Sequence, residues 1–328
     1  MHEASYYKIL KDKKLQCFLC PRFCVVDDGQ RGFCGVRENR GGKLFSLAYE
    51  QPAAVNIDPI EKKPLYHFLP GTKSFSIGTV GCNLNCRFCQ NWDISRAMPE
   101  KAPYMQLTPK QAVEMAIKSG CKSISYTYNE PTIFLEYVLD IAKLAKKNGL
   151  KNVLVSNGYI NPEPLADALK VVDAANIDLK AFTEKFYSEF TDAKLKPVLE
   201  ALKLMKKCGI WIEITNLILP TKNDNMRDIS RMSKWIRDNI GKQTPLHFSR
   251  FFPMYKMIDA EPTPEKTLFA AQKTARKYLD FVYIGNIGAE NNTLCPKCQN
   301  ILIERKNYTI KLHGIHCTNC GKILPGVY

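Results

Sequence analysis

The 328-residue sequence lacks long apolar runs, low-complexity tracts and long internal repeats. No apolar stretch approaches the roughly 18 residues that span a membrane. Residues 1–5 lack the basic and apolar regions of a secretory signal, so we expect a cytoplasmic protein that does not enter a membrane. Hydrophobic residues make up 45% of the chain and charged residues 24%, which is ordinary for globular proteins. This composition excludes wholesale disorder, collagen-like repeats and a coiled-coil rod.

Acidic residues are fewer than basic ones, 32 against 47, and the formal net charge is +15. Such an excess favours encounter with anionic partners such as nucleic acid, nucleotides or acidic proteins. Charge alone does not choose among them. The simpler interpretation is that solvated, lysine-rich helix faces supply most of the excess.

Strand-like and helix-like stretches alternate through the middle of the chain at intervals of about thirty residues, the spacing of repeated βα units. Thr108 and Gln111 predict a capping box, with Pro109 at the first helical position. We expect an α/β fold, a partial (β/α)6 TIM-like barrel over residues 71–289. The six expected β segments are 74–78, 123–128, 152–156, 172–179, 211–219 and 245–251, and a further short strand is expected at 281–285.

The two ends of the chain differ from this middle. Residues 1–70 are rich in Cys, Gly and Pro, and residues 290–328 have short strand-like stretches between paired cysteines. Segments this short seldom build a sufficient core unaided. We therefore expect a Cys-rich N-terminal metal-binding module at 1–70 and a C-terminal zinc ribbon at 290–328.

Thirteen cysteines are many for a chain in a reducing compartment, where clustered thiols more often bind metal or iron–sulfur clusters than form disulfides. Eleven fall into three groups. The C-terminal group has two CxxC pairs separated by eighteen residues, within the range of a four-thiolate zinc ribbon. Four thiolates close a tetrahedron, so we expect a role in folding. The residues of this group are Cys295, Cys298, Cys317 and Cys320.

The N-terminal group has the looser spacing CxxCxxxCx9C. Its four thiols can hold zinc or a second iron–sulfur cluster, and the spacing does not distinguish the two. Zinc is the interpretation that we favour from the sequence. The residues are Cys17, Cys20, Cys24 and Cys34.

The central group, Cys82, Cys86 and Cys89, has the spacing CxxxCxxC and directly follows the first expected barrel strand. Three thiolates leave one iron of a 4Fe-4S cluster without a protein ligand, and an open coordination position is what a catalytic metal site requires. A structural zinc site with a distant fourth ligand is the alternative. It does not explain why the loop follows the carboxyl end of a barrel strand, where such folds keep their active sites.

This loop, with Phe88 before its last cysteine, resembles the signature of the radical S-adenosylmethionine (SAM) superfamily. The resemblance implies a 4Fe-4S cluster that binds SAM at its open iron and cleaves it reductively to a 5′-deoxyadenosyl radical. That radical would abstract hydrogen from an unidentified substrate, with a protein among the candidates. It also implies a low-potential electron donor such as ferredoxin or flavodoxin.

Later segments continue the resemblance. Residues 128–131 lie where the family usually has Gly-Gly-Glu-Pro, and Tyr and Asn in place of the two glycines are a departure. Residues 156–158 resemble the Thr-Asn-Gly of glycyl-radical-enzyme activases, and residues 178–180 match their Asp-Leu-Lys. Tyr255 stands where activases have a histidine, and His247 is expected to face the barrel mouth. The SAM-binding residues implied are Phe88, Asn129, Glu130, Ser156, Asn157, Asp178 and Lys180.

A resemblance over nearly the whole chain rests on residues 17–24, 57–67 and 89–95 and on the terminal ribbon. These segments resemble the AmmeMemoRadiSam-system radical SAM enzyme family, which is similar to pyruvate formate-lyase activating enzymes. The resemblance implies Memo-like and AMMECR-like proteins as candidate partners. The alternatives are a glycyl-radical-enzyme activase, a radical RNA-modifying enzyme and a non-catalytic zinc-binding or nucleic-acid-binding scaffold.

Overall fold

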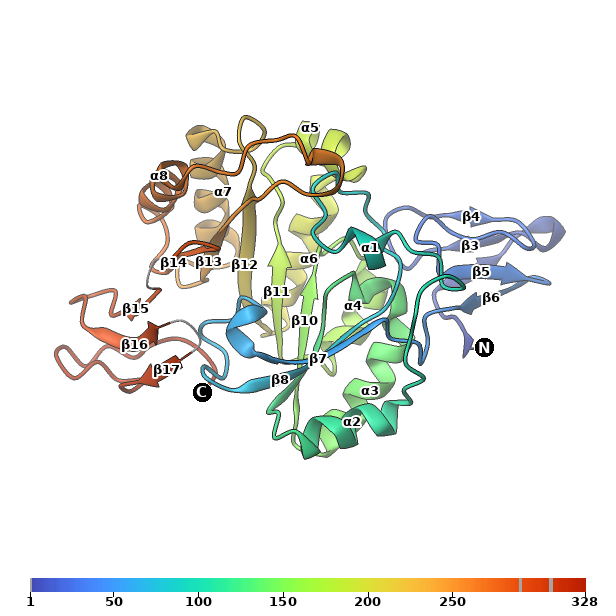
Figure 1. Ribbon diagram of the computed structural model, residues 1–328, viewed down its shortest axis with the longest axis horizontal. Helices are drawn as coiled ribbons and strands as arrows, with labels where there is room; N and C mark the ends of the chain where they lie inside the picture. Colours follow the sequence, from blue (N-terminus) through green and yellow to red (C-terminus); the bar gives the residue numbers. More distant parts are fainter. Residues whose placement is uncertain (1, 289–290, 307–308) are drawn as a thin grey trace.

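The computed structural model describes residues 2–288, 291–306 and 309–328. An eight-stranded sheet lies at its centre (Figure 1). Its strands are β7 (Ala54–Pro59), β8 (Lys73–Gly78), β9 (Ser123–Tyr126), β10 (Lys151–Ser156), β11 (Ala174–Asp178), β12 (Trp211–Ile218), β13 (Leu246–Arg250) and β14 (Val282–Gly285). They are paired in chain order from β7 to β14, and β8 to β14 run parallel while β7 is antiparallel to β8.

All six expected barrel segments are therefore present and parallel, and the further expected strand joins them as β14. This confirms the α/β partial barrel, with seven parallel strands where six were expected in the barrel. The sheet also contains β7, a strand within the segment that the sequence assigned to the N-terminal module. The expected boundary at 289–290 falls on residues outside the described part of the chain.

Helices connect the parallel strands. The longer ones are α2 (Pro109–Lys118), α3 (Leu135–Lys147), α4 (Pro162–Leu169), α6 (Leu195–Lys207), α7 (Met226–Asn239) and α8 (Glu265–Ala275). The expected capping box of α2 is confirmed, because Thr108 Oγ1 accepts from the backbone N–H of Gln111 while Gln111 Oε1 accepts from that of Thr108. The short helical segments are η1 (Lys11–Lys13), η2 (Ile60–Lys62), α1 (Trp92–Ser95), η3 (Pro131–Phe134), α5 (Glu184–Phe186), the π-helical η4 (Tyr187–Thr191) and η5 (Tyr255–Met257).

The two faces of the sheet differ in character because side chains alternate along each strand. One face packs into the main core and carries apolar residues such as Ile77, Ile124 and Phe248. The alternate positions face the barrel interior and are unusually polar. They include Ser74, Ser76, Ser125, Asn176, Glu213 and His247, all buried. A polar interior fits a binding site better than a packed apolar core.

The segment between β7 and β8 fills one end of the interior. Its apolar residues Ile60, Leu65 and Phe68 are fully buried against Val153 of β10 and Ala174 of β11. These contacts place residues 60–68 inside the barrel. No helix in the described residues has the length and apolarity that crossing a membrane requires.

The two ends of the chain form small sheets on opposite sides of the barrel (Figure 1). The N-terminal sheets have the orders β1-β6-β5 and β2-β3-β4, and the C-terminal sheet has the order β15-β16-β17. The strands are β1 (His2–Glu3), β2 (Tyr7–Ile9), β3 (Leu15–Cys17), β4 (Val25–Val26), β5 (Arg37–Arg40), β6 (Lys43–Ser46), β15 (Thr293–Leu294), β16 (Ile301–Lys306) and β17 (Thr309–Leu312).

Candidate active site

The central cysteines lie in the loop between β8 and α1. Cys82, Cys86 and Cys89 are close enough that each pair interacts electrostatically. Burial raises the pKa of Cys82, and it raises the pKa of Cys86 to about 12. Thiolates are the form that binds metal, so this loop favours ionised sulfur only when a cation compensates the charge.

The loop is held from two sides. On one side, Gly81 has φ +89°, and a Cβ added there would lie 2.5 Å from the carbonyl oxygen of Cys34 and 2.8 Å from a methyl carbon of Val36. On the other side, the backbone N–H of Asn85 donates to the carbonyl of Thr191 in η4 at 2.9 Å. The loop therefore lies between the N-terminal module and the barrel.

Arg96, directly after α1, was not anticipated from the sequence. Its guanidinium donates to the carbonyl oxygen of Cys82 at 3.2 Å and also to that of Leu84. These bonds fix the backbone at the first cysteine. An arginine near a cysteine loop carries no local signal of such a role, because the bonds form only once the loop closes back on α1.

Phe88 is buried in a small apolar cluster that includes Phe186, Leu219 and Phe251. Its ring centroid lies 5.9 Å from that of Phe186. Phe88 thus packs the cysteine loop onto the carboxyl ends of the barrel strands. The ammonium of Lys180 lies 6.0 Å from the Phe88 ring centroid.

Glu130 is fully buried at the start of η3 and accepts four hydrogen bonds. Its Oε1 accepts from the backbone N–H of Thr132 (3.0 Å), the Thr132 hydroxyl (2.6 Å) and the Ser156 hydroxyl (2.7 Å). Its Oε2 accepts from the backbone N–H of Asn157 at 2.8 Å. Burial nevertheless raises the pKa of Glu130. The structure thus brings together three expected SAM-binding residues, Glu130, Ser156 and Asn157, from neighbouring strands.

Asn157 extends this network to the cysteine loop. Its Nδ2 donates to Asn83 Oδ1 at 2.9 Å and lies 3.9 Å from Cys82 Sγ. Asn83 in turn donates to the carbonyl of Tyr159 at 2.7 Å. The buried carboxylate of Glu130 is therefore linked to the first cysteine through Asn157.

Asn129 lies against the cysteine loop rather than in the interior. Its Oδ1 accepts from the backbone N–H of Thr79 at 3.1 Å, and its Nδ2 donates to the carbonyl of Gly81 at 2.9 Å. The preceding Tyr128 has φ +71°, a conformation that glycine adopts readily and tyrosine rarely. The backbone at this position therefore has the geometry of a glycine although the residue differs.

Asp178 is the last residue of β11 and Lys180 follows it, and Lys180 Nζ lies 2.5 Å from Asp178 Oδ2. Burial opposes the charged form of Lys180, but the charges of Asp178 and Cys86 together raise the pKa of Lys180 above its ordinary value. A cation thus faces the cysteine loop. The backbone N–H of Lys180 also donates to the Tyr187 hydroxyl at 3.1 Å, a contact for which the sequence gives no signal.

A buried ion pair in the interior was also missed. Lys63 Nζ lies 2.7 Å from Asp58 Oδ2, which also accepts from the Tyr128 hydroxyl at 2.5 Å. Burial opposes ionisation of Asp58, but these partners lower its pKa to about 2. The three residues come from β7, the segment after η2 and the loop after β9, so only the tertiary fold reveals them.

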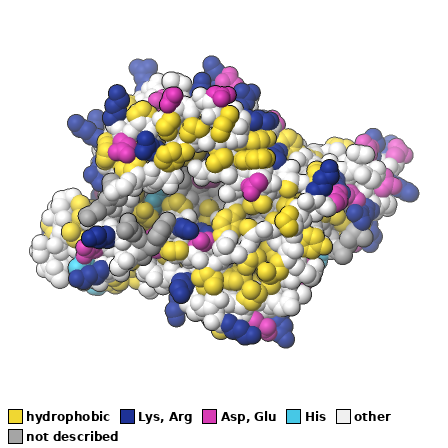
Figure 2. All heavy atoms as spheres, in the orientation of Figure 1, with side chains coloured by type: hydrophobic (Ala, Val, Ile, Leu, Met, Phe, Trp, Pro, Cys, Tyr) yellow, Lys and Arg dark blue, Asp and Glu magenta, His cyan; other side chains and the backbone are white. Residues whose placement is uncertain are grey.

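A cavity of about 780 Å³ opens between the barrel interior and the C-terminal sheet. The molecule is visibly hollowed on this face (Figure 2). Thr215, His247 and Ser249 line the cavity from the strands, and Tyr66 and Arg305 line it from the flanking segments. His247 therefore lies at this cavity, and its Nε2 lies 2.6 Å from Glu213 Oε2.

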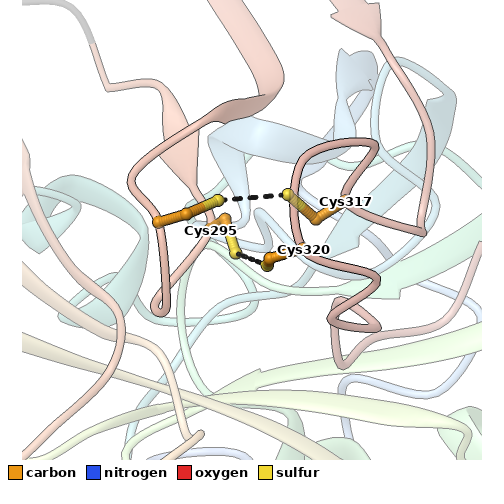
Figure 3. A group of neighbouring side chains, drawn as sticks. Cys295, Cys317 and Cys320 are labelled. Carbon is orange, nitrogen blue, oxygen red and sulfur yellow. Dashed lines mark hydrogen bonds between the residues drawn. The ribbon is translucent and has the colours of Figure 1, made fainter.

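The C-terminal cysteines form a compact group (Figure 3). The four Sγ atoms lie within 4.8 Å of one another, with 3.5 Å between Cys295 and Cys320 and 3.3 Å between Cys298 and Cys317. Sulfurs around one tetrahedral zinc ion lie about 3.8 Å apart, since the Zn–S bond is about 2.3 Å. This group fits a single metal ion.

The N-terminal cysteines also gather in space. Each pair among Cys17, Cys20, Cys24 and Cys34 interacts electrostatically. In the described residues, however, only the C-terminal group brings three or more potential metal-binding atoms within 4.8 Å of one another. The N-terminal sulfurs are therefore more widely spaced than those of the ribbon.

Comparison with known proteins places the site in a family. The family described as the Radical SAM superfamily matches residues 76–236, which contain the cysteine loop and the strand ends around it. An uncharacterized protein of Methanocaldococcus jannaschii is 47% identical over 330 residues, covering 98% of each chain. Pyruvate formate-lyase-activating enzyme of Clostridium pasteurianum is 25% identical, covering 61% of this chain and 87% of its own.

Two solved structures share the fold. A radical SAM methyltransferase from Sphaerobacter thermophilus has a TM-score of 0.52 at 11% identity, covering 66% of this chain and 67% of its own. SuiB from Streptococcus suis, bound to its precursor peptide, has a TM-score of 0.51 at 14% identity, covering 69% and 51%. The chain belongs to the radical SAM superfamily and is an enzyme of that class.

Proposed function

We propose that Cys82, Cys86 and Cys89 hold the 4Fe-4S cluster that the family implies and leave its fourth iron to SAM. When bound, the cluster and SAM together supply a 5′-deoxyadenosyl radical for hydrogen abstraction. The observation that carries this proposal is the gathering of three partly buried thiols of one loop at the carboxyl end of β8. Three ligands on four irons leave the position that SAM requires.

The charge of Lys180 supports this assignment of the loop. Three thiolates crowded in a buried loop repel one another, and a cation beside them favours their ionised form. Lys180 supplies that cation next to Cys86. We propose that its ammonium also pairs with the SAM carboxylate, because charge-assisted hydrogen bonds to carboxylates are among the strongest that a side chain makes. Asp178 orients the ammonium.

Glu130 has a different proposed role from the direct SAM contact suggested by the family pattern. Three donors converge on Oε1 of Glu130 and one on Oε2, so Thr132, Ser156 and Asn157 already hold this carboxylate within the chain. We propose that Glu130 is a positioning residue that holds Ser156 and Asn157 for SAM. The amide of Asn157, which faces Cys82, would then contact SAM beside the cluster.

We propose that the substrate enters through the 780 Å³ cavity between the barrel and the ribbon. Four basic residues line it against two acidic ones, Glu61 and Glu265. The basic residues are Lys62, Arg250, Arg305 and Lys306. An excess of basic groups in a concave site favours a substrate with an anionic group near the reacting carbon.

Relatives named as glycyl-radical-enzyme and pyruvate formate-lyase activating enzymes support a protein as this substrate. A low-potential ferredoxin or flavodoxin is the proposed electron donor. The segments resembling the AmmeMemoRadiSam family lead us to propose Memo-like and AMMECR-like proteins as partners. The ribbon is proposed to bind zinc, for which its sulfur spacing is suited.

The test is anaerobic reconstitution of the full chain with iron and sulfide, followed by reduction with dithionite in the presence of SAM. We expect 5′-deoxyadenosine and methionine from the wild type and from Cys208→Ala, a matched control that removes an exposed solitary thiol. Cys86→Ala is expected to yield neither product while keeping the ribbon metal. Cleavage by Cys86→Ala at the wild-type rate would refute the assignment.

A further inference from the structure

The N-terminal cysteines form a metal-binding group that the catalytic assignment does not use. Backbone N–H groups favour the ionised form of its sulfurs. Those of Leu19, Arg22 and Val36 do so at Cys17, Cys20 and Cys34. Cys24 accepts from the N–H of Phe33 at 3.5 Å. Backbone donors directed at sulfur are characteristic of thiolates bound to a metal centre, where they also tune its potential.

The spacing of the sulfurs indicates which kind of metal centre. The ribbon sulfurs already lie at the separations of a single-ion site. Every pair of N-terminal sulfurs is close enough to interact electrostatically, yet no three of these sulfurs lie within 4.8 Å of one another. The sulfurs of the central group behave in the same way. Each pair of them interacts electrostatically, but the three do not lie as close together as sulfurs around a single metal ion. In a 4Fe-4S cluster each thiolate binds a different iron, so its ligands are farther apart than around one zinc ion.

We infer that Cys17, Cys20, Cys24 and Cys34 bind a second iron–sulfur cluster of the 4Fe-4S class, and that this cluster passes electrons to the catalytic one. The geometry thus favours iron–sulfur over the zinc expected from the sequence. With four protein thiolates, every iron of this cluster is ligated, so it has no open position for SAM. Its chemistry is restricted to electron transfer.

The packing of the module supports this role. The carbonyl oxygen of Cys34 lies directly against Gly81, the residue before the first cysteine of the catalytic loop. Arg22, beside Cys20, donates from Nε to the carbonyl of Asn83 at 2.5 Å. The N-terminal cysteine segment therefore contacts the catalytic loop directly.

Arg37 anchors the module to the barrel. Its buried guanidinium donates to Glu136 of α3 at 2.9 Å and 3.1 Å, and it lies near Cys17 and Cys34. A buried cation beside two thiolates offsets part of the negative charge that cluster binding brings into the module. A zinc ion with four thiolates would need the same compensation, so this contact supports a thiolate centre without choosing the metal.

A reduced ferredoxin or flavodoxin gives one electron to the N-terminal cluster, which passes one electron to the catalytic cluster and returns to its oxidised state. That electron enters the sulfonium of SAM, breaks one carbon–sulfur bond and leaves methionine and the 5′-deoxyadenosyl radical. This part of the inference rests on the proposed function, whereas the identity of the N-terminal metal does not.

The test measures iron and zinc per chain, with Mössbauer spectra of the full-length protein reconstituted with ⁵⁷Fe. We expect about eight irons in the wild type and about four in both Cys20→Ala and Cys86→Ala, since each variant loses one cluster of four irons. All three are expected to keep about one zinc in the ribbon, and Cys208→Ala serves as the control. Cys86→Ala leaves the N-terminal module untouched, so its iron is informative even where Cys20→Ala does not fold.

The outcomes separate the two proposals. If Cys86→Ala contains no iron and the wild type contains about two zinc ions per chain, the second cluster is refuted and the proposed function is unaffected. If Cys86→Ala contains iron but the wild type does not cleave SAM, the proposed function is refuted instead. For the electron path, Cys20→Ala should keep SAM cleavage driven by dithionite but lose at least tenfold when reduced flavodoxin is the donor. Equal losses with both reductants would contradict the path.

Discussion

Gly81→Ala tests whether the N-terminal module and the catalytic loop are packed as a unit. The added methyl group would lie 2.5 Å from the Cys34 carbonyl oxygen and 2.8 Å from Val36, and the residue would have to keep φ +89°. A positive φ costs a non-glycine residue about 1–2 kcal/mol. Overpacking of a filled site costs about 1–3 kcal/mol more, so the total loss of stability is about 2–5 kcal/mol.

Gly120→Ala is the matched control. Gly120 also has a positive φ, +68°, but an added Cβ would meet no atom within 4 Å. It should therefore lose only the conformational part, about 1–2 kcal/mol. The difference of about 1–3 kcal/mol corresponds to a melting temperature lower by several degrees in Gly81→Ala, measured by calorimetry or circular dichroism. Equal melting temperatures for the two variants would show that Gly81 does not lie against Cys34.

Three further predictions concern single side chains. Lys180→Met should weaken SAM binding about 10- to 100-fold in equilibrium dialysis, because the loss of a charge-assisted hydrogen bond has about this effect. The exposed control Lys185→Met should bind SAM with the affinity of the wild type. Equal affinities of Lys180→Met and the wild type would exclude the ammonium from the SAM site. Burial lowers the pKa of His67 from 6.5 to about 4, so its folded form binds a proton less readily than the unfolded chain. The contribution of the neutral His67 to stability is present above pH 6.5 and is lost as the pH falls towards 4. His67→Gln should therefore show a smaller acid-induced drop in melting temperature than the wild type. An identical drop in the two proteins would contradict the lowered pKa. Cys298→Ala should lose about one zinc ion per chain by mass spectrometry without loss of iron, and retention of that zinc would rule out the four-sulfur site.

Local patterns made much of the fold predictable from the sequence. The capping box of Thr108 and Gln111 depends on residues three apart, and it is present as expected. The alternation of strands and helices likewise depends on short-range periodicity, and it predicted each of the seven parallel strands. The strand β7 was assigned to the N-terminal module because its place in the sheet depends on pairing with β8, which no local pattern records.

The cysteine groups were predictable because their spacing along the chain is the signal. The contacts between elements were not. Glu130 acquires its donors from Ser156 and Asn157 only when β9 and β10 lie side by side. The ion pair of Asp58 and Lys63 is hidden for the same reason, since its environment is set by burial inside the barrel.

Tyr128 shows how a departure in sequence can preserve a conformation. The family pattern places glycine there, and this sequence has tyrosine instead. The residue instead adopts φ +71°, the conformation that a glycine would allow, and its hydroxyl donates to Asp58. The strain of a positive φ is offset by a buried hydrogen bond that glycine could not make.

The central claim is that the cysteine loop leaves one iron open for SAM. Electron paramagnetic resonance of the reduced protein with SAM labelled with ¹⁷O in its carboxylate tests this most directly, because a magnetic nucleus bound to the iron broadens the cluster signal. We expect broadening in the wild type and none in Cys86→Ala. A wild-type signal unchanged by labelled SAM, or the same broadening in Cys86→Ala, would contradict it.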